Sequence, residues 1–386
     1  MSRMKNPFIY GKQVSGKAFF NRKKEKAGIR NVLDGGSNVL LYGPRRYGKS
    51  SLVGEVLSDI RAEGGLCAEL NMMDIASLDD FIVRFARVVY RELAPVAGAL
   101  NLVAGFFRRL SPSVGLDEAG KPELRISFSA GHATVENLRE VLQLPERLCG
   151  GDCRIVIAID EFQEVAELGL GAQFERTMRS VIEKQQHVSY LFFGSKTHVL
   201  QRMFTAKSRP FYNSAQKFLL ERPSPDESAE FLVRRFASVS LKLERSLAKE
   251  MVRKVDNVPY YLQALGSWTF NAVRGREASS VSRADVEEGF ESLYAAERIL
   301  LEDTFRAHSE SQRLLMRALA MEPTERFDEA YRRRNGLSST STVNTALRRL
   351  IDDATVEKSS SGYKLSDPLL AHHLVLVGSS YQFRVC

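Results

Sequence analysis

Cysteine and long apolar stretches are both scarce in this chain of 386 residues. It has only four cysteines, and the pair Cys149 and Cys153 has neither a second pair nor a histidine nearby, which argues against a zinc site. We therefore expect free thiols, as in a protein of a reducing compartment. No apolar run approaches the roughly 18 residues that span a membrane. The N-terminus also lacks the apolar core of a signal peptide, so we expect a cytoplasmic protein without membrane contact.

Positive charge is concentrated at the N-terminal end of the chain. Residues 1–49 hold twelve Lys and Arg and two acidic residues, a net charge of +10. Since the whole chain has a net charge of +8, the remaining residues sum to −2. One interpretation is a surface for nucleic acid or an acidic partner. The other is a solvated helix face. We favour the second because aromatic residues do not alternate with the charges, as they do in proteins that bind single strands.

The most informative stretch is 39–52, which has the pattern of a buried strand, a loop with two glycines and a helix. Residues 43–50 fit the phosphate-binding pattern G-x-x-x-x-G-K-[ST] without a mismatch. Gly43 and Gly48 allow the loop to curl its N–H groups around phosphate oxygens, and the following helix adds its positive dipole end. Lys49 is expected to contact the β- and γ-phosphates and Ser50 to bind Mg²⁺. The predicted ATP-binding residues of this loop are Gly43, Pro44, Arg45, Arg46, Tyr47, Gly48, Lys49, Ser50 and Ser51.

A second apolar strand, residues 154–159, leads into two carboxylates, Asp160 and Glu161. Its continuous apolar character is typical of a central parallel strand that is covered on both faces. Carboxylates at the C-terminal end of such a strand lie where open α/β sheets bind ligands. We predict that Asp160 holds Mg²⁺ through water and that Glu161 is the general base for the attacking water. Glu161 and Lys49 are the two predicted catalytic residues.

Further strands are predicted at 66–72, 188–195 and 216–220. Ser195 ends one of them and either senses the γ-phosphate or is a turn residue; the sequence favours neither interpretation. The helical pattern that begins at Leu78 breaks at Pro95. We predict that the following segment, to about residue 133, is an insertion with a hairpin, because residues 124–128 alternate like an edge strand.

The C-terminal region has the pattern of three helices and a hairpin, which is that of a winged helix. The helices are expected at 309–321, from Pro323 to near Gly336, and after Ser338 or Ser339; strands at 355–358 and 363–365 follow. Arg348 and Arg349 on the third helix, with Lys358 and Lys364 on the wing, would suit double-stranded DNA. Residues 309–386 hold eleven basic against nine acidic residues, so a protein-interaction module is an equal alternative.

Together these residues resemble the archaeal-type ATPase family, in the signal-transduction branch of AAA+-related P-loop proteins. The resemblance implies an α/β fold with a parallel sheet of order 5-1-4-3-2, a helical lid and a C-terminal winged helix. It also implies that Pro259 of the lid lies near the adenine. The segments that carry it are Phe19, Asn21-Arg22 and Glu25, the loop 43–50, Ile159-Asp160-Glu161-Phe162-Gln163, Gly194-Ser195 and Val258-Pro259-Tyr260-Tyr261-Leu262.

Two departures from the family pattern affect these expectations. Members usually carry Gly-Gly before the x-Pro of the lid, whereas this chain has Asp256-Asn257. Many also place Gly-Arg after a Pro-Phe-Tyr segment, but here residues 210–212 lead to Asn213-Ser214. An arginine that acts on the transition state must then come from elsewhere. The candidates are Arg45, Arg46, Arg209 and Arg222.

We therefore expect a P-loop ATPase domain at 1–222 with an insertion at about 98–133, a helical lid at 223–306 and a winged helix at 307–386. The predicted function is an ATP-binding and ATP-hydrolysing switch that couples nucleotide state to the winged helix. One alternative is a DNA-associated ATPase that resembles origin-recognition or transposition-helper ATPases. Another is a nucleotide-binding scaffold with little turnover. A protein partner and a homo-oligomer are both compatible with the sequence.

Overall fold

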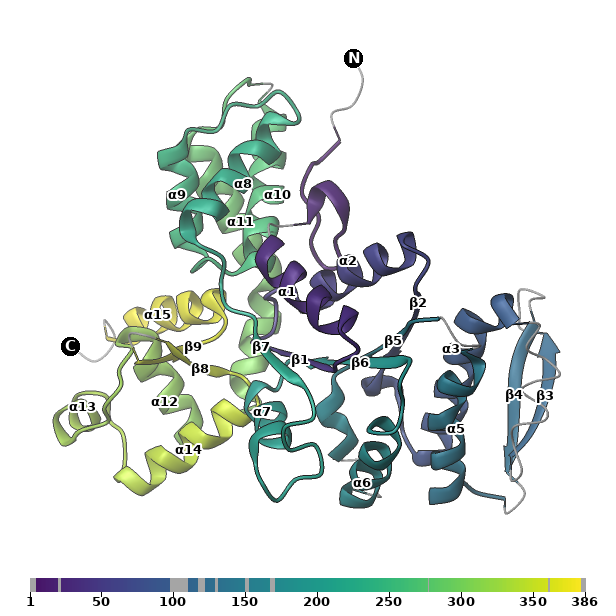
Figure 1. Cartoon of the computed structure of the whole chain (residues 1–386). Helices are drawn as coiled ribbons and strands as arrows, with labels where there is room; N and C mark the ends of the chain where they lie inside the picture. The colour runs from purple at the N-terminus through teal and green to yellow at the C-terminus, as the bar shows by residue number, and fades with distance from the viewer. Residues whose placement is uncertain are drawn as a thin grey trace. The chain divides into compact units, whose positions relative to one another are not determined.

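The structure is a computed structural model that describes residues 5–19, 22–97, 110–116, 122–128, 131–149, 153–166, 171–276, 278–359 and 362–382 (Figure 1). The chain divides into two units. Residues 23–43 and 52–220 form the first, which we call the sheet unit, and residues 1–22, 44–51 and 221–386 form the second, the helical unit. The predicted three-domain boundaries stay a prediction. No helix among the described residues is both long and apolar enough to cross a membrane.

A parallel five-stranded sheet is the centre of the sheet unit. Its strands are β1 (Val39–Tyr42), β2 (Leu66–Asn71), β5 (Ile155–Asp160), β6 (Val188–Gly194) and β7 (Gln216–Leu219). They lie in the order β2-β5-β6-β1-β7. When the five strands are numbered 1 to 5 along the chain and read from the β7 edge, the order is 5-1-4-3-2. The predicted strand order is therefore confirmed. Every residue of β1 and β6 is buried, as continuous apolar strands require when helices cover both faces.

Helices connect the strands and supply their apolar faces to the core. They are α1 (Lys23–Asp34), α2 (Lys49–Ala62), α3 (Leu78–Ala97), α5 (Val135–Leu148), α6 (Gly171–Ile182) and α7 (Thr197–Thr205), with short 3-10 turns at Met72–Asp74 and Phe162–Ala166. The start of α5 is fixed by a capping box in which Thr134 and Asn137 satisfy each other's backbone N–H groups. α3 packs against α5 and β2, and its helix continues to Ala97, past the predicted break at Pro95. A proline removes one backbone hydrogen bond, which the helix tolerates near its end.

Two of the four basic residues of α1 form ion pairs within the sheet unit. Lys26 forms ion pairs with Glu55 and Asp59 of α2, at 3.5 and 2.8 Å. Arg30 contacts Glu63 at 2.5 Å and Asp34 at 3.5 Å. These pairs support the interpretation of this segment as a solvated helix face. Asn21, one of the residues that carry the family resemblance, lies outside the described residues.

The predicted hairpin is confirmed, whereas its description as an insertion stays a prediction. β3 (Leu110–Leu116) and β4 (Pro122–Phe128) pair antiparallel, with Leu110 opposite Phe128 and Val114 opposite Leu124. Leu124 is buried in the main core of the sheet unit, and α3 contacts β4 (Figure 1). The hairpin is therefore attached to the sheet unit through the face of α3 and one buried leucine.

The structure corrects one expectation about the cysteines. Cys149 and Cys153 form a disulfide, so the prediction of free thiols is wrong for this pair. Their Cα atoms lie 5.6 Å apart, a separation that a disulfide can span. Cys67 is a free thiol on β2, and burial raises its pKa to about 11.

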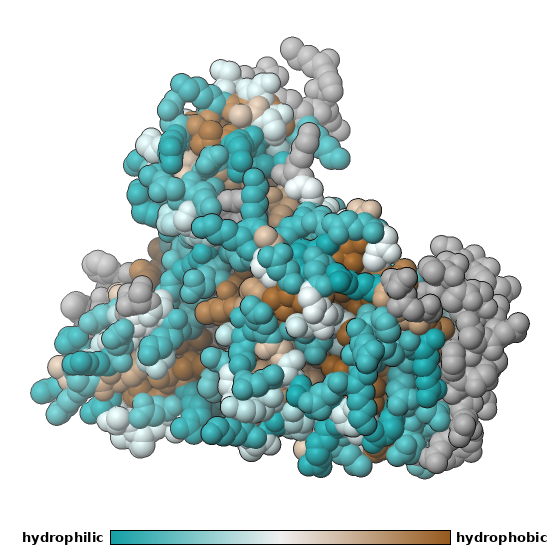
Figure 2. All heavy atoms as spheres, in the orientation of Figure 1, coloured by the Kyte–Doolittle hydropathy of each residue, from teal (hydrophilic) through white to brown (hydrophobic). Residues whose placement is uncertain are grey.

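In the helical unit, four helices pack side by side (Figure 1). They are α8 (Pro225–Ala237), α9 (Arg245–Lys254), α10 (Pro259–Gly275) and α11 (Arg283–Arg306). α10 and α11 approach closely at Gly289, where an added Cβ would lie 2.6 Å from the backbone nitrogen of Thr269. The visible face of α8 and α9 is mostly hydrophilic in Figure 2, as expected for helices that bury one apolar face.

The N-terminal segment is part of the helical unit and packs on α10. Gln263 of α10 is buried; its side chain donates to the Ala18 carbonyl at 2.9 Å and accepts from the Ile9 N–H at 3.3 Å. The ring of Phe8 lies over Gly266, where an added Cβ would be 2.5 Å from a ring carbon. These contacts join residues more than 240 positions apart in the sequence.

The predicted winged helix is confirmed, with two differences. Its elements are α12 (Glu310–Met321), α13 (Glu329–Arg334), α14 (Thr340–Asp352), β8 (Val356–Ser359) and β9 (Gly362–Leu365). The second helix begins at Glu329, not at Pro323, because Thr324 exchanges backbone hydrogen bonds with Tyr363 and so keeps its segment extended. A final helix, α15 (Pro368–Gln382), was not predicted. Ser339 caps α14 by accepting from the Thr342 N–H.

Candidate functional site

The phosphate-loop motif begins at the C-terminal end of β1. Gly43 follows Tyr42, the last residue of the strand, and an added Cβ there would lie 2.7 Å from the Leu220 carbonyl oxygen. No side chain fits in that space, so the first glycine of the motif is required by the close approach of the segment after β7. Residues 44–51 continue in the helical unit, and α2 starts at Lys49.

The loop itself contains two residues with left-handed backbone. Gly48 has φ 86°, which glycine adopts at no steric cost, and open space surrounds its Cα. Arg46 has φ 68°, which is strained for a residue with a side chain. Its carbonyl accepts from the Tyr260 N–H at 3.2 Å. Its guanidinium contacts Asp367 and the Tyr261 hydroxyl and lies about 5 Å from the ring centroids of Tyr260 and Tyr261.

Lys49 is buried and its amine donates to the Pro44 carbonyl at 2.7 Å. The amine thus lies inside the curve of the loop, where an anion would compete with this neutral acceptor. Ser50 and Ser51 differ. The Ser51 hydroxyl accepts from the Val14 N–H at 3.1 Å and is buried, whereas Ser50 is exposed. Of the two serines, only Ser50 is therefore placed to meet a solvent-borne metal ion.

The two predicted carboxylates lie at the C-terminal end of β5, in the sheet unit. Asp160 is the last residue of the strand, and its Oδ1 accepts from the Glu161 N–H at 2.8 Å. Glu161 has left-handed backbone, with φ 49°. This turn directs its carboxylate toward the end of β6, where Glu161 Oε2 accepts from both the N–H and the hydroxyl of Ser195, each at 3.0 Å. The structure thus brings together Glu161 and Ser195.

One residue of this group was not predicted as a site residue. Gln163 is buried, and its amide donates to Glu161 Oε2 at 2.5 Å and to Glu164 Oε1 at 3.2 Å. Gly194 gives it room, because an added Cβ at that position would lie 2.3 Å from Gln163 Oε1 and 3.1 Å from the Glu161 Cα. The sequence signal was the glutamine two positions after the glutamate, opposite a strand that ends in Gly-Ser.

The structure assigns structural contacts to three of the four candidate arginines. Arg209 pairs with the buried Glu175, whose pKa is raised by burial and lowered by Arg209, with a net increase. Arg222 contacts Tyr47, Asp256 and Glu357. Arg46 contacts Asp367, as described above. Arg45 is exposed. The first three arginines therefore hold elements of their own units together.

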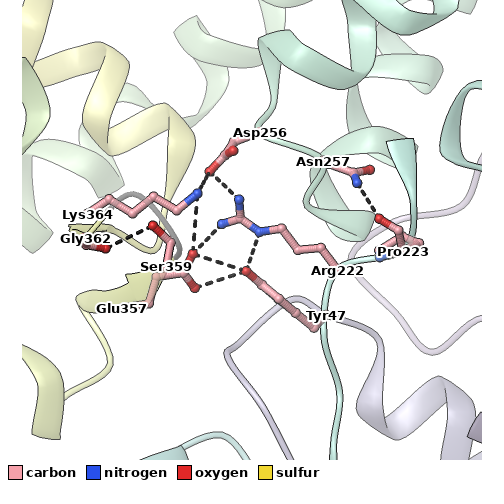
Figure 3. Close-up of polar contacts among 9 residues, drawn as sticks. All are labelled: Tyr47, Arg222, Pro223, Asp256, Asn257, Glu357, Ser359, Gly362 and Lys364. Atoms are coloured by element: carbon pink, nitrogen blue, oxygen red, sulfur yellow. Dashed lines mark hydrogen bonds and ion pairs between the residues drawn. The ribbon is translucent and has the colours of Figure 1, made fainter. Parts of the chain in front are cut away.

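The lid departure from the family pattern has a structural explanation. Asp256 and Asn257 have φ values of 48° and 54°, the left-handed region that glycine adopts freely. Asn257 is held there by its side chain, which donates to the Pro223 carbonyl at 2.6 Å (Figure 3). The same side chain accepts from the Ser228 hydroxyl at 2.5 Å. The backbone conformation that Gly-Gly would give is therefore kept. Pro259 follows as the first residue of α10, a position that suits proline.

Three of the four predicted DNA contacts are on the surface of the winged helix. Arg348, Arg349 and Lys358 are exposed. Lys364 differs, since its amine forms an ion pair with Asp256 at 2.7 Å and its side chain is mostly buried. It is therefore used inside the helical unit, and we no longer count it among the DNA contacts.

Comparisons with known proteins agree with this architecture. Residues 300–375 match the family model described as a probable winged helix domain. A Walker-type ATPase of Pyrococcus abyssi is similar with a TM-score of 0.69 and 19% identity, covering 96% of this chain and 99% of that chain. The chain has the fold of an archaeal Walker-type ATPase with a C-terminal winged helix.

The ORC2 protein of Aeropyrum pernix, solved in ADPNP–ADP complexes, is similar with a TM-score of 0.58 and 13% identity, covering 98% of both chains. No curated protein sequence matches. At these identities the likeness establishes the fold. It confirms the predicted resemblance and the predicted fold class, a P-loop ATPase sheet with a helical part and a winged helix.

The contact between Glu161, Gln163 and Gly194 yields a prediction. Gly194→Ala should lower the free energy of unfolding by about 1–3 kcal/mol, because the new methyl group would overlap Gln163 Oε1. Gly275→Ala is the matched control: that glycine ends α10 with open space around it, so alanine should be neutral or stabilising. Denaturant unfolding measures both. Equal stability of Gly194→Ala and wild type would show that Gln163 can move away freely.

Proposed function

We propose that the chain binds ATP with Mg²⁺ at the loop 43–51 and hydrolyses it. The observation that carries this proposal is the placement of the residues after three adjacent strands. β5, β6 and β1 are neighbours in one parallel sheet, so their C-terminal ends share an edge. Glu161 and Ser195 meet at this edge, and the loop begins there with Gly43.

Each residue then has a chemical role. Lys49 exchanges the Pro44 carbonyl for a phosphate oxygen, which is a stronger acceptor for an ammonium group. Ser50 and Asp160 would hold Mg²⁺, which neutralises phosphate charge when it is bound. A hydroxyl and a carboxylate are oxygen donors, the type of ligand that Mg²⁺ prefers.

Glu161 is the proposed general base. Its Oε2 accepts hydrogen bonds from Ser195 and Gln163, which fix the direction of the carboxylate. A base must be oriented before it can take a proton from water, so these donors are positioning residues in the proposed reaction. In this proposal Ser195 acts on Glu161.

Replacing the loop lysine tests nucleotide binding. Lys49→Ala should abolish ATP binding in calorimetric titration, because the loop loses its phosphate-directed cation. Lys24→Ala removes an exposed lysine of α1 and serves as the control that should bind like wild type. Unchanged affinity in Lys49→Ala would refute the site.

Replacing the proposed base tests hydrolysis separately. Glu161→Gln should still bind ATP but slow single-turnover hydrolysis by roughly 10²–10⁴-fold, the usual contribution of a general base. Glu164→Gln is the control, since Glu164 lies in the same turn and pairs with Lys196 at 2.9 Å. Hydrolysis at the wild-type rate in Glu161→Gln would exclude Glu161 as the base. Undetectable turnover by wild type would favour the scaffold alternative.

A DNA-associated ATPase is the second candidate, and the exposed face of α14 favours it. Arg348 and Arg349 both point away from the core residues Val343, Leu347 and Leu350. Lys358 lies on the wing, where it is exposed and its amine is 5.9 Å from the Tyr363 ring centroid. A helix that presents adjacent arginines suits phosphate or guanine contacts.

The double variant Arg348→Ala/Arg349→Ala tests this surface. Loss of two phosphate contacts should weaken duplex binding and flatten the salt slope by about one unit for each contact. Fluorescence anisotropy at two salt concentrations measures this, with Arg253→Ala/Arg274→Ala, two exposed lid arginines, as the control. ATP turnover without DNA should not change. If wild type and both variants bind duplex equally, α14 does not read DNA.

A further inference from the structure

Two side chains of the phosphate loop contact the winged helix, and both contacts lie within the helical unit. Arg46 contacts Asp367, which lies between β9 and α15. The Tyr47 hydroxyl donates to Glu357 on β8, at 3.0 Å to Oε2 and 3.3 Å to Oε1 (Figure 3). Both residues immediately precede Gly48 and Lys49, so any movement of their side chains moves the part of the loop that would face phosphate.

Tyr47 belongs to a cluster of five residues from four segments, which we call the Tyr47 cluster: Tyr47, Arg222, Asp256, Glu357 and Lys364 (Figure 3). Arg222 donates to the Tyr47 hydroxyl at 2.5 Å, and its guanidinium lies 5.5 Å from the centroid of the tyrosine ring. It also pairs with Glu357 and, at 2.6 Å, with Asp256. Lys364 completes the cluster with ion pairs to Asp256 at 2.7 Å and Glu357 at 3.8 Å.

The charges of the Tyr47 cluster balance, with two cations and two carboxylates. Burial, and next the Glu357 carboxylate, raise the pKa of Tyr47, so its hydroxyl keeps the proton that it donates. Burial also raises the pKa of Glu357, while Arg222 and Lys364 lower it, with a net increase. Tyr47 is only 4% exposed. Apart from Asp256, whose side chain is 41% exposed, the members of the cluster are mostly buried. Such a cluster fixes geometry, because removing one member leaves a mostly buried partner unpaired.

Arg46 forms the second attachment between the phosphate loop and the winged helix. Its backbone conformation is also the reason why the loop needs this attachment. A side-chain-bearing residue keeps a left-handed backbone only where the surroundings hold it there. For Arg46 the surroundings are the lid, through Tyr260 and Tyr261, and the winged helix, through Asp367. The strain at φ 68° is thus offset by contacts that come from outside the loop.

We propose that the winged helix positions the phosphate loop, with Asp367 acting through Arg46 and Glu357 acting through Tyr47. The winged helix is then a structural wall of the nucleotide site, and its undocking lowers nucleotide affinity. This inference rests on the proposed function for its consequence in binding, but the ordering of the loop is a property of the nucleotide-free protein. By linkage, bound nucleotide favours the docked winged helix to the same extent.

Asp367 allows a sharp test because its two roles can be separated. Its Oδ1 accepts from the N–H groups of Leu369 and Leu370, at 2.9 and 3.2 Å, and so caps α15, while Oδ2 contacts Arg46 and accepts from the Tyr261 hydroxyl at 2.7 Å. Asp367→Ser keeps a good helix cap but is too short to reach the arginine. Asp328→Ser is the matched control, since Asp328 caps α13 by accepting from the Tyr331 N–H at 2.8 Å. The effect of Asp367→Asn should fall between those of Asp367→Ser and Asp328→Ser, because its amide oxygen accepts hydrogen bonds but carries no charge.

The first measurement is hydrogen exchange of residues 44–51 in the nucleotide-free full chain. We expect Asp367→Ser to speed exchange of these amides about tenfold, which corresponds to 1.4 kcal/mol of lost local stability. Amides of β5 and β6 should exchange as in wild type. The second measurement is calorimetric titration with MgADP, in which affinity should fall about tenfold. Glu357→Gln, which acts through Tyr47, should change both quantities in the same direction.

The outcomes separate this inference from the proposed function. The positioning role would be overturned if Asp367→Ser and Glu357→Gln had the same loop exchange and the same MgADP affinity as Asp328→Ser. This holds even if the wild type binds MgADP. Faster loop exchange without any MgADP binding by wild type would support the positioning role and refute the nucleotide site. Equal exchange of the loop amides in all variants would refute the positioning role, whether or not nucleotide binds.

Discussion

The contact between Arg46 and Asp367 is the interaction on which the candidate site depends most. It joins the third variable residue of the phosphate-loop motif to a helix cap in the winged helix, 321 positions later in the chain. Arg46 lies in a strained backbone region, so the loop would relax without external contacts. Asp367 and the lid tyrosines supply those contacts, and the Tyr47 cluster adds a second attachment one residue further on. Nucleotide affinity would therefore depend on residues that have no place in the phosphate-loop motif.

The strands and the position of the two carboxylates could be predicted, because both depend on local pattern. Continuous apolar runs between turn residues predict buried parallel strands, and the loop motif, Asp160 and Glu161 each follow such a run. The sheet order came from the family resemblance. Gln163, Asp367 and Glu357 could not be found in this way. Their roles arise from side chains that meet across more than 300 positions, or from a turn geometry such as φ 49° at Glu161, and neither leaves a periodic signal. The Cys149–Cys153 disulfide was missed for the same reason.

The structure accounts for one of the two departures from the family pattern and not for the other. Asp256-Asn257 keeps the left-handed backbone that Gly-Gly would provide, and Asp256 also joins the Tyr47 cluster. Of the four candidates for the missing arginine, Arg46, Arg209 and Arg222 are held by carboxylates in their own units, and Arg45 is exposed. Two residues of the wing already have partners within the helical unit, because Glu357 and Lys364 contact the loop and the lid. A DNA role would then rest on α14 and Lys358 rather than on the whole wing.

The most direct test of this account is the effect of bound nucleotide on the wing. Hydrogen exchange of residues 356–365 should be measured in the full wild-type chain with and without saturating MgADP, with binding established by calorimetry on the same sample. If the winged helix positions the phosphate loop, linkage requires that nucleotide stabilise the docked wing, so these amides should exchange more slowly in its presence. Wing exchange that is unchanged or faster while nucleotide is bound would contradict the account.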